Sequence, residues 1–264
     1  MSRAGDGGPA TAPGLTVRNA RLTLDGVRVL DGLDLRLEPG SWTCLLGPSG
    51  VGKTSLLRLV AGLIGPPEAE GAVLADDGRP VAGRLAWMAQ TDALLPWLSA
   101  RENVRLGARL RREPAAAGRE RADALLARVG LADRADALPR ALSGGMRQRV
   151  ALARTLMEDR PFVLLDEPFS ALDAVTRHAL QAEAARLLAG RTVLLVTHDP
   201  MEALRLGHRI LVLTGAPARL AEPLVPDGPP PRAPDDPSVV TRHGALLDRL
   251  AGVGEATETA EAGA

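Results

Sequence analysis

The residues with the clearest chemical potential are in the segment GPSGVGKT, residues 47–54. This segment matches the pattern GxxxxGK[ST] between an apolar strand-like run and a helix-like run, the setting in which the pattern binds phosphate. Its glycines let successive backbone N–H groups point inward, and the helix start adds positive potential. Lys53 would reach the β- and γ-phosphates of a nucleotide, and the Thr54 hydroxyl would bind Mg²⁺. The expected cofactor-binding residues here are Gly47, Pro48, Ser49, Gly50, Val51, Gly52, Lys53, Thr54 and Ser55.

Two adjacent carboxylates follow the apolar run FVLLDEP, residues 162–168. Asp166 stands at the carboxyl end of an expected buried strand, where ligands of open α/β sheets gather, and is a candidate Mg²⁺ ligand. Glu167 would polarise a water for attack on a γ-phosphate, so it is the candidate catalytic base. A solvated turn could explain the same two residues in isolation. Their occurrence with a phosphate loop favours the catalytic interpretation.

A third polar segment, LSGGMRQR at residues 142–149, opens a helix-like run. Ser143, Gly144 and Gly145 offer a hydroxyl and bare N–H groups at a positive helix end, which is a second candidate anion site. An ordinary serine-capped helix is the alternative. Because one chain does not need two γ-phosphate sites, we expect this segment to serve the nucleotide of a second copy. The expected assembly is a homodimer with ATP at the interface.

Composition limits the remaining possibilities. The chain has 264 residues, of which 45% are apolar, enough for one large α/β domain or two small ones. The 32 basic residues balance the 32 acidic ones, so no overall basic charge points to a nucleic-acid partner. Cys44 is the only cysteine, which excludes an internal disulfide. Only one of the basic residues, Lys53, is a lysine, and it stands in the phosphate loop.

The elements that position these residues follow from the apolar patterning. Alternating runs around Asp25-Gly26 predict a β-hairpin, and 98–158 reads as almost wholly helical. FVLLDEP, a helix near 174–189 and TVLLVTHD predict a parallel βαβ unit. We divide the chain into a disordered segment 1–14, a domain 15–215 that contains the phosphate loop and a helical subdomain at about 91–158, and a proline-rich extension 216–264. One short helix near 239–251 is expected in that extension.

These motifs occur in the order found in a known family. GPSGVGKT, Gln90 in WMAQTD, LSGGMRQRVALAR, VLLDEP, SALD and THD together resemble the ATP-binding subunit of an ABC transporter over about residues 15–215. The resemblance implies a P-loop NTPase fold: an α/β ABC nucleotide-binding domain with a mostly parallel core sheet, an antiparallel β subdomain and a helical subdomain. It also implies ATP hydrolysis with Mg²⁺ and a head-to-tail dimer.

The resemblance assigns roles to three further residues. Gln90 would sense the γ-phosphate and Mg²⁺, and His198 would hold the γ-phosphate and the catalytic geometry. Asp173 would communicate across the dimer at the nucleotide. One departure is Leu24, which stands where the family normally stacks an aromatic residue on adenine. A glutamine after a strand or a histidine at a strand end is a common surface feature by itself, so these roles rest on the resemblance.

The segment ALLPW, residues 93–97, indicates which transporter. In the family this region faces the coupling helix of the membrane subunit, although Leu94, Leu95 and Trp97 could instead be core residues. With the neighbouring motifs it resembles the importer branch for nitrate, taurine, alkanesulfonates and the hydroxymethylpyrimidine precursor of thiamine, with a preference for the pyrimidine members. The implied partners are permease subunits and a periplasmic or lipoprotein solute-binding protein, at the cytoplasmic face of the inner membrane. An exporter ATPase and a non-transport ABC protein are the alternatives.

Overall fold

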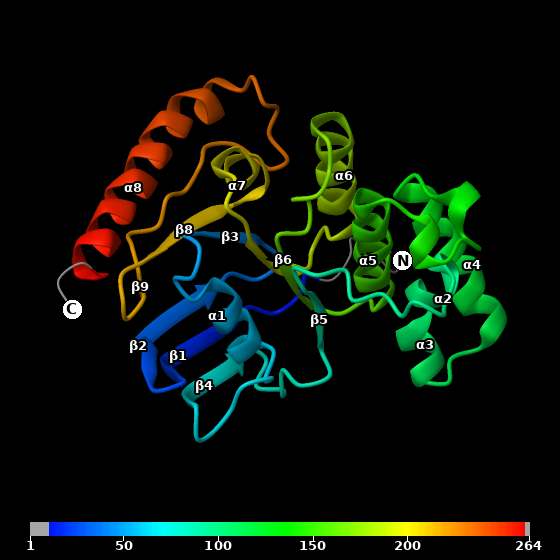
Figure 1. The fold of residues 1–264 in the computed structure, drawn as a ribbon, viewed down its shortest axis with the longest axis horizontal. Helices are drawn as coiled ribbons and strands as arrows, with labels where there is room; N and C mark the ends of the chain where they lie inside the picture. The colour runs from blue at the N-terminus through cyan, green and yellow to red at the C-terminus, as the bar shows by residue number, and fades with distance from the viewer. Residues whose placement is uncertain (1–10, 262–264) are drawn as a thin grey trace, which may run out of the picture.

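The computed structural model describes the chain from residue 11 to residue 261, and its side chains as far as residue 250. Two sheets form the centre of the molecule (Figure 1). The smaller is antiparallel, with the order β2-β1-β4. Asp25 and Gly26 connect its first two strands, both with positive φ, as the hairpin prediction requires. Its strands are β1 Leu15–Leu24, β2 Val27–Leu37 and β4 Ala69–Ala75.

The larger sheet has the order β5-β6-β7-β3-β8-β9 and is parallel except for its last strand. Its central strands β3, β6 and β7 are mostly apolar and are buried along their whole length, because both faces are covered. In β3, for example, Leu45 packs on the side of the small sheet, whereas Cys44 and Leu46 pack on the opposite side, with the main hydrophobic cluster. The strands are β3 Trp42–Leu46, β5 Leu85–Met88, β6 Phe162–Asp166, β7 Thr192–Val196, β8 Arg209–Thr214 and β9 Arg219–Leu220.

A helical part lies at one end of the larger sheet, beyond β5 and β6 (Figure 1). It contains α2 Ala100–Val104, α3 Leu106–Leu110, α4 Ala115–Arg128 and the first turns of α5 Gly144–Met157, with two 3₁₀ turns before α5. Helix α5 then returns to the sheet and leads into β6. The remaining helices are α1 Lys53–Val60, α6 Ala174–Leu187, α7 Pro200–Leu206 and α8 Pro237–Glu261. The predicted fold class and the parallel β6-α6-β7 unit are confirmed.

Both ends of the chain differ from the prediction. Residues 1–10 of the expected disordered segment lie outside the described residues, but 11–14 are ordered: the Ala12 N–H donates to the Gly190 carbonyl at 2.7 Å. The expected short helix near 239–251 is wrong in length, because α8 runs from Pro237 to Glu261. Val239 and Leu246 of α8 are fully buried, and α8 packs against α7. Arg232 leads into it with its guanidinium bonded to the Leu204 and Gly207 carbonyls, so the extension is fastened to the sheet domain.

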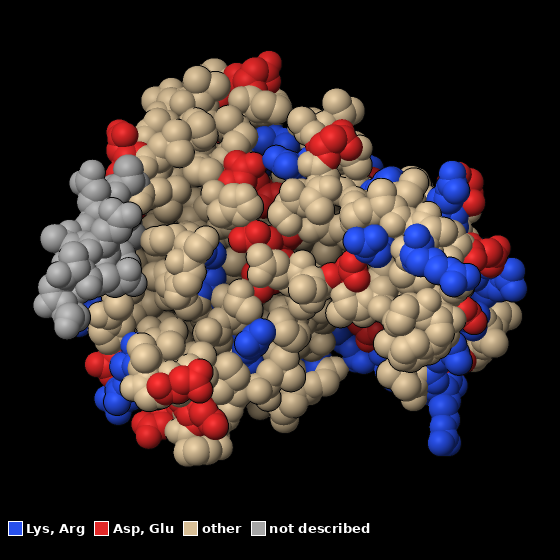
Figure 2. Space-filling view, viewed as in Figure 1, with Lys and Arg blue, Asp and Glu red and all other residues tan. Residues whose placement is uncertain are grey.

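Charges of both signs are interspersed on the face shown in Figure 2. Many arginines pair with a neighbouring carboxylate, such as Arg84 with Asp77 and Arg101 with Asp123. This fits the neutral balance of the whole sequence. Among the described residues, no helix is both long and apolar enough to cross a membrane.

Candidate active site

The phosphate loop has the backbone geometry that its glycines predict. Gly47 and Gly52 have φ values of 154° and 106°, and an added Cβ would come within 2.5 Å of the Leu213 carbonyl oxygen at Gly47 and 2.7 Å of Val29 Cγ1 at Gly52. Gly52 precedes α1 without any side-chain cap, so the first N–H groups of α1 have no capping side chain in front of them. The loop and the start of the helix therefore form a cradle of backbone donors suited to an anion.

Lys53 lies inside this cradle. Its side chain is buried, and Nζ donates to the Gly47 and Pro48 carbonyl oxygens at 2.7 Å each. Burial lowers the pKa of Lys53, while the nearby Glu167 and Asp166 carboxylates oppose that shift. The ammonium thus donates hydrogen bonds to two carbonyl oxygens of the loop. A phosphate oxygen can take the place of these carbonyl oxygens as the acceptor.

The two carboxylates after β6 have different surroundings. Asp166 is 1% exposed and accepts a hydrogen bond from the Thr54 hydroxyl at 2.9 Å. Burial raises the pKa of Asp166 despite this bond. Glu167, the next residue, has φ of 49°, a backbone conformation that turns it out of the strand direction. Its side chain meets two other loops rather than Thr54.

Gln90 and His198 both reach Glu167. His198 Nδ1 lies 3.2 Å from Glu167 Oε1, and Gln90 Nε2 lies 3.5 Å from Glu167 Oε2. Gln90 follows β5, Glu167 follows β6 and His198 follows β7, and these three strands are neighbours in the parallel sheet. The carboxyl ends of parallel strands meet at one edge, so residues far apart in sequence converge here.

A cavity of about 240 Å³ lies between the phosphate loop, Gln90 and Glu167, and His198 does not line it. It is lined by Ser49, Gly50, Gly52, Lys53, Thr54, Ser55, Gln90, Asp166 and Glu167. A second cavity of about 200 Å³ adjoins the loop on the side of Val27, Arg28 and Val29. Leu24 does not line that second cavity, so the aliphatic surface beside the loop comes from the start of β2 instead.

The segment around Ser143 lies apart from both cavities. Ser143 caps α5 by accepting a bond from the Met146 N–H, and Ser143 and Gly144 are exposed. Asp173 is also exposed and caps α6 by accepting a bond from the Thr176 N–H at 3.0 Å. This bond lowers the pKa of Asp173. None of Ser143, Gly144, Gly145 and Asp173 lines the phosphate cavity of their own chain.

Sequence reasoning missed three residues of α5 that brace the site. Gln148 is buried, donates to the Glu167 carbonyl at 2.9 Å and accepts from the Ala171 N–H at 2.9 Å. Arg147 donates to the Asp92 side chain at 2.9 Å, and Arg154 donates to the Asp92 and Ala93 carbonyls. One helix therefore holds both the loop after Gln90 and the loop after Glu167. In the sequence these residues are recognisable only as part of the segment RQRVALAR. The segment does not indicate which distant residues they bind.

The segment ALLPW is divided between core and surface. Leu94 is 9% exposed and belongs to the main hydrophobic cluster, whereas Trp97 is 70% exposed. The core interpretation is thus correct for Leu94 and wrong for Trp97.

The sequence of the chain was compared with those of known protein families and proteins. Residues 30–170 match the family described as ABC transporter. The chain belongs to the ABC transporter family. An uncharacterized ABC transporter ATP-binding protein of Haemophilus influenzae is 43% identical over 89% of this chain and 98% of its own length. The aliphatic sulfonates import ATP-binding protein SsuB 1 of Rhodococcus jostii is 51% identical over 70% of this chain and 73% of its own length.

A solved structure agrees with the fold of this ABC protein. The ATP-binding cassette MJ0796, in a dimeric post-hydrolysis state bound to ADP and Pi, has a TM-score of 0.72 and 28% identity, covering 81% of this chain and 99% of its own. The chain is therefore an ABC ATP-binding subunit, and its activity is ATP hydrolysis. The expected fold class and ATPase activity are confirmed.

Proposed function

We propose that this ABC ATPase energises a bacterial importer of aliphatic sulfonates. Its relatives from Rhodococcus jostii and from Paracoccus denitrificans, the latter 42% identical over 91% of this chain, are both named as aliphatic sulfonates import ATP-binding proteins. The observation that carries the proposal is this identity across the whole fold, together with an exposed Trp97 beside the loop that follows Gln90. These relatives favour the sulfonate alternative over nitrate, taurine and the pyrimidine precursor.

We infer the residue roles from the geometry. Glu167 accepts a proton from the water that attacks the γ-phosphate, since its carboxylate borders the phosphate cavity. His198 holds Glu167 in place through the 3.2 Å contact, and its contact with the γ-phosphate is the role that the family resemblance implies. Gln90 reports the state of the site to the loop that contains Trp97. Lys53 and the N–H groups of the phosphate loop balance the phosphate charge.

The oxygen groups around Asp166 fit Mg²⁺. A hydroxyl, Thr54 Oγ1, and a buried carboxylate, Asp166 Oδ2, lie 2.9 Å apart, and Gln90 adds an amide oxygen at the cavity. Mg²⁺ prefers such oxygens and takes few protein ligands beside phosphate and water. The described part of the chain contains no group of three or more His, Cys, Asp and Glu side chains that could hold a metal ion by themselves. The ion would neutralise charge on the β- and γ-phosphates.

Two copies of the chain would form the working unit. Ser143, Gly144, Gly145 and Asp173 are exposed or partly exposed and lie outside the phosphate cavity of their own chain. The exposed start of α5, which Ser143 caps through the Met146 N–H, gains an anionic ligand if a second copy presents its nucleotide there. The proposed partners are therefore a second copy, permease subunits and a solute-binding protein, with this chain at the cytoplasmic face of the membrane.

Growth on a sulfonate tests the proposal. A strain lacking this chain should fail to grow with 1-pentanesulfonate as the sole sulfur source, while growing normally on sulfate. The wild-type chain should restore growth, and Glu167→Gln should not. Normal growth of the deleted strain on sulfonates, with failure on a pyrimidine precursor or nitrate instead, would contradict the sulfonate assignment. The ATPase assignment would be unaffected by that result.

A further inference from the structure

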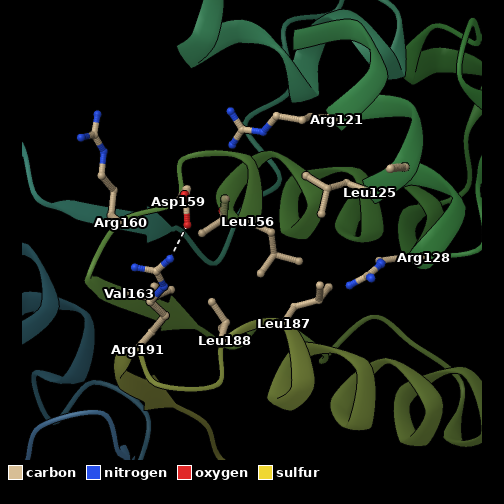
Figure 3. Close-up of a pocket in the computed structure, with 12 residues that line it drawn as sticks. Arg121, Leu125, Arg128, Leu156, Asp159, Arg160, Val163, Leu187, Leu188 and Arg191 are labelled. Carbon is tan, nitrogen blue, oxygen red and sulfur yellow. Dashed lines mark hydrogen bonds and ion pairs between the residues drawn. The ribbon is translucent and has the colours of Figure 1, made fainter. Parts of the chain in front are cut away.

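A cavity of about 360 Å³ lies away from the nucleotide site, between α4, the end of α5, the start of β6 and the end of α6 (Figure 3). It borders the start of β6 at Val163, whereas Asp166 and Glu167 stand at and after the end of that strand. The five residues of β6 separate its ends by about 13 Å. None of the phosphate-loop residues, Gln90 or His198 lines this cavity. Its size is within the range of small-molecule sites.

The floor of the cavity is aliphatic. Leu125 of α4, Leu156 of α5 and Leu187 of α6 converge on it from three helices, with Leu188 and Val163 beneath (Figure 3). Leu125 and Leu156 are only partly buried although they pack against the main core. An apolar body placed over them would remove this remaining surface from water, which is favourable.

The rim is strongly basic. Arg121, Arg128, Arg160 and Arg191 line the cavity with a single acidic residue, Asp159, which pairs with Arg191. Among the described residues, Arg160 makes no hydrogen bond or ion pair, and Arg128 has only a 3.7 Å approach to Glu183. Guanidinium groups stay charged at all physiological pH values and bind carboxylate, sulfonate or phosphate oxygens in pairs.

The apolar floor distinguishes this cavity from a protein surface on which arginines are simply solvated. Solvated arginines need no shared hollow, whereas here three helices leave leucines partly exposed in a cavity that four arginines also line. A cation is excluded by the charge, and inorganic sulfate would leave the floor uncovered. We infer that this cavity is a second ligand site of the chain, for a small amphipathic organic anion with an aliphatic or aromatic body and one sulfonate or carboxylate group.

Calorimetric titration of the full chain with 2-naphthalenesulfonate tests this site. We expect saturable binding with a Kd of about 0.1 mM, as is usual for a ligand of this size, and the same Kd with saturating ATP present. Sodium sulfate and neutral 2-naphthol should bind at least tenfold more weakly. The double variant Arg128→Gln/Arg160→Gln should weaken naphthalenesulfonate binding at least tenfold while it retains wild-type ATPase activity, which shows that it folds.

Arg119→Gln is the matched control, because Arg119 lies on the same helix α4 but is exposed and outside the cavity. It should bind the probe as the wild type does. Three results would overturn the inference: no saturable binding, as expected if a partner protein covers the cavity instead; displacement of the probe by ATP; or equal affinity in the double variant. Each result is independent of which solute the transporter carries.

Discussion

His198 Nδ1 and Glu167 Oε1 lie 3.2 Å apart, so the loops after β7 and β6 meet at one carboxylate. Gln90 approaches the other oxygen of the same carboxylate from the loop after β5. Three loops of the site thus make contact at Glu167. The proposed mechanism of ATP hydrolysis depends on this carboxylate as the base.

Replacement of Glu167 by Gln should separate binding from turnover. The amide keeps the size of the side chain but cannot accept the proton of the attacking water, so ATP hydrolysis should fall at least a hundredfold. ATP affinity should stay within about threefold of wild type, because the phosphate cradle is unchanged. Phosphate release and nucleotide titration measure the two effects. Glu120→Gln, on the exposed side of α4, is the control, and wild-type turnover in Glu167→Gln would remove Glu167 as the base.

Lys53→Arg should lose nucleotide binding although the charge is kept. The Lys53 ammonium fits between the Gly47 and Pro48 carbonyls in a buried cradle, and a planar guanidinium does not fit the same space. We expect ATP affinity to fall at least tenfold, measured by titration with a fluorescent ATP analogue. Arg58→Lys in the last turn of the same helix is the reverse control and should bind normally. Normal ATP affinity in Lys53→Arg would mean that charge alone is needed there.

Trp97 and Leu94 should respond differently to alanine. Trp97 is exposed, so Trp97→Ala should keep the circular dichroism and ATPase activity of the isolated chain but reduce stimulation by the permease. Leu94→Ala should instead lower the free energy of unfolding by about 2 kcal/mol, since it leaves a cavity in the core. Val175→Ala, at another exposed position, on α6, controls for loss of a surface side chain. Unfolding of Trp97→Ala, or full permease stimulation, would contradict the docking interpretation.

Glu202 should make the stability fall as pH rises. It is buried beside Gln181, Asp199 and Arg205, and burial raises its pKa to about 7 from the ordinary 4.5. Between these two pKa values the folded state binds more protons than the unfolded state. The contribution of Glu202 to the free energy of unfolding is therefore fully present below about pH 4.5 and is lost as the pH rises towards 7. The loss is about 3 kcal/mol at most.

The variant Glu202→Gln tests whether Glu202 causes the predicted fall in stability with rising pH. Urea unfolding at pH 5, 6, 7 and 8 should show less decline in stability than the wild type over this range, because the amide does not titrate. Glu222→Gln, on the surface, should leave the wild-type decline in place. A decline of the same size in Glu202→Gln would assign the pH dependence to other groups.

The local parts of the site were predictable because each lies in one short segment. The phosphate loop and the Asp166-Glu167 pair need only a strand, a turn and a helix in sequence order. The bracing by Gln148 and Arg154 was not predictable, because their partners are backbone carbonyls of residues that are distant in sequence or on another element. Burial of Leu94 and exposure of Trp97 depend on how α2 and α5 pack, which residue frequencies do not determine.

The length of α8 was missed for a different reason. Its second half, AGVGEATETAE, contains glycine and threonine, which lower intrinsic helix propensity, and offers no clear apolar stripe. Burial of Val239 and Leu246 against the sheet domain stabilises the first half. Tertiary packing, rather than propensity, anchors the helix there.

Cross-linking between two copies tests whether two chains enclose the nucleotide. Cys44 is the only cysteine and is fully buried, so it will not interfere. In a Glu167→Gln background, one tagged chain carries Ser49→Cys in the phosphate loop and an untagged chain carries Ser143→Cys. If two chains enclose the nucleotide, a disulfide should form between tagged and untagged chains in the presence of ATP and a mild oxidant. No disulfide should form without ATP. No cross-link with ATP, or the same yield without it, would contradict the claim that two chains clamp the nucleotide between them.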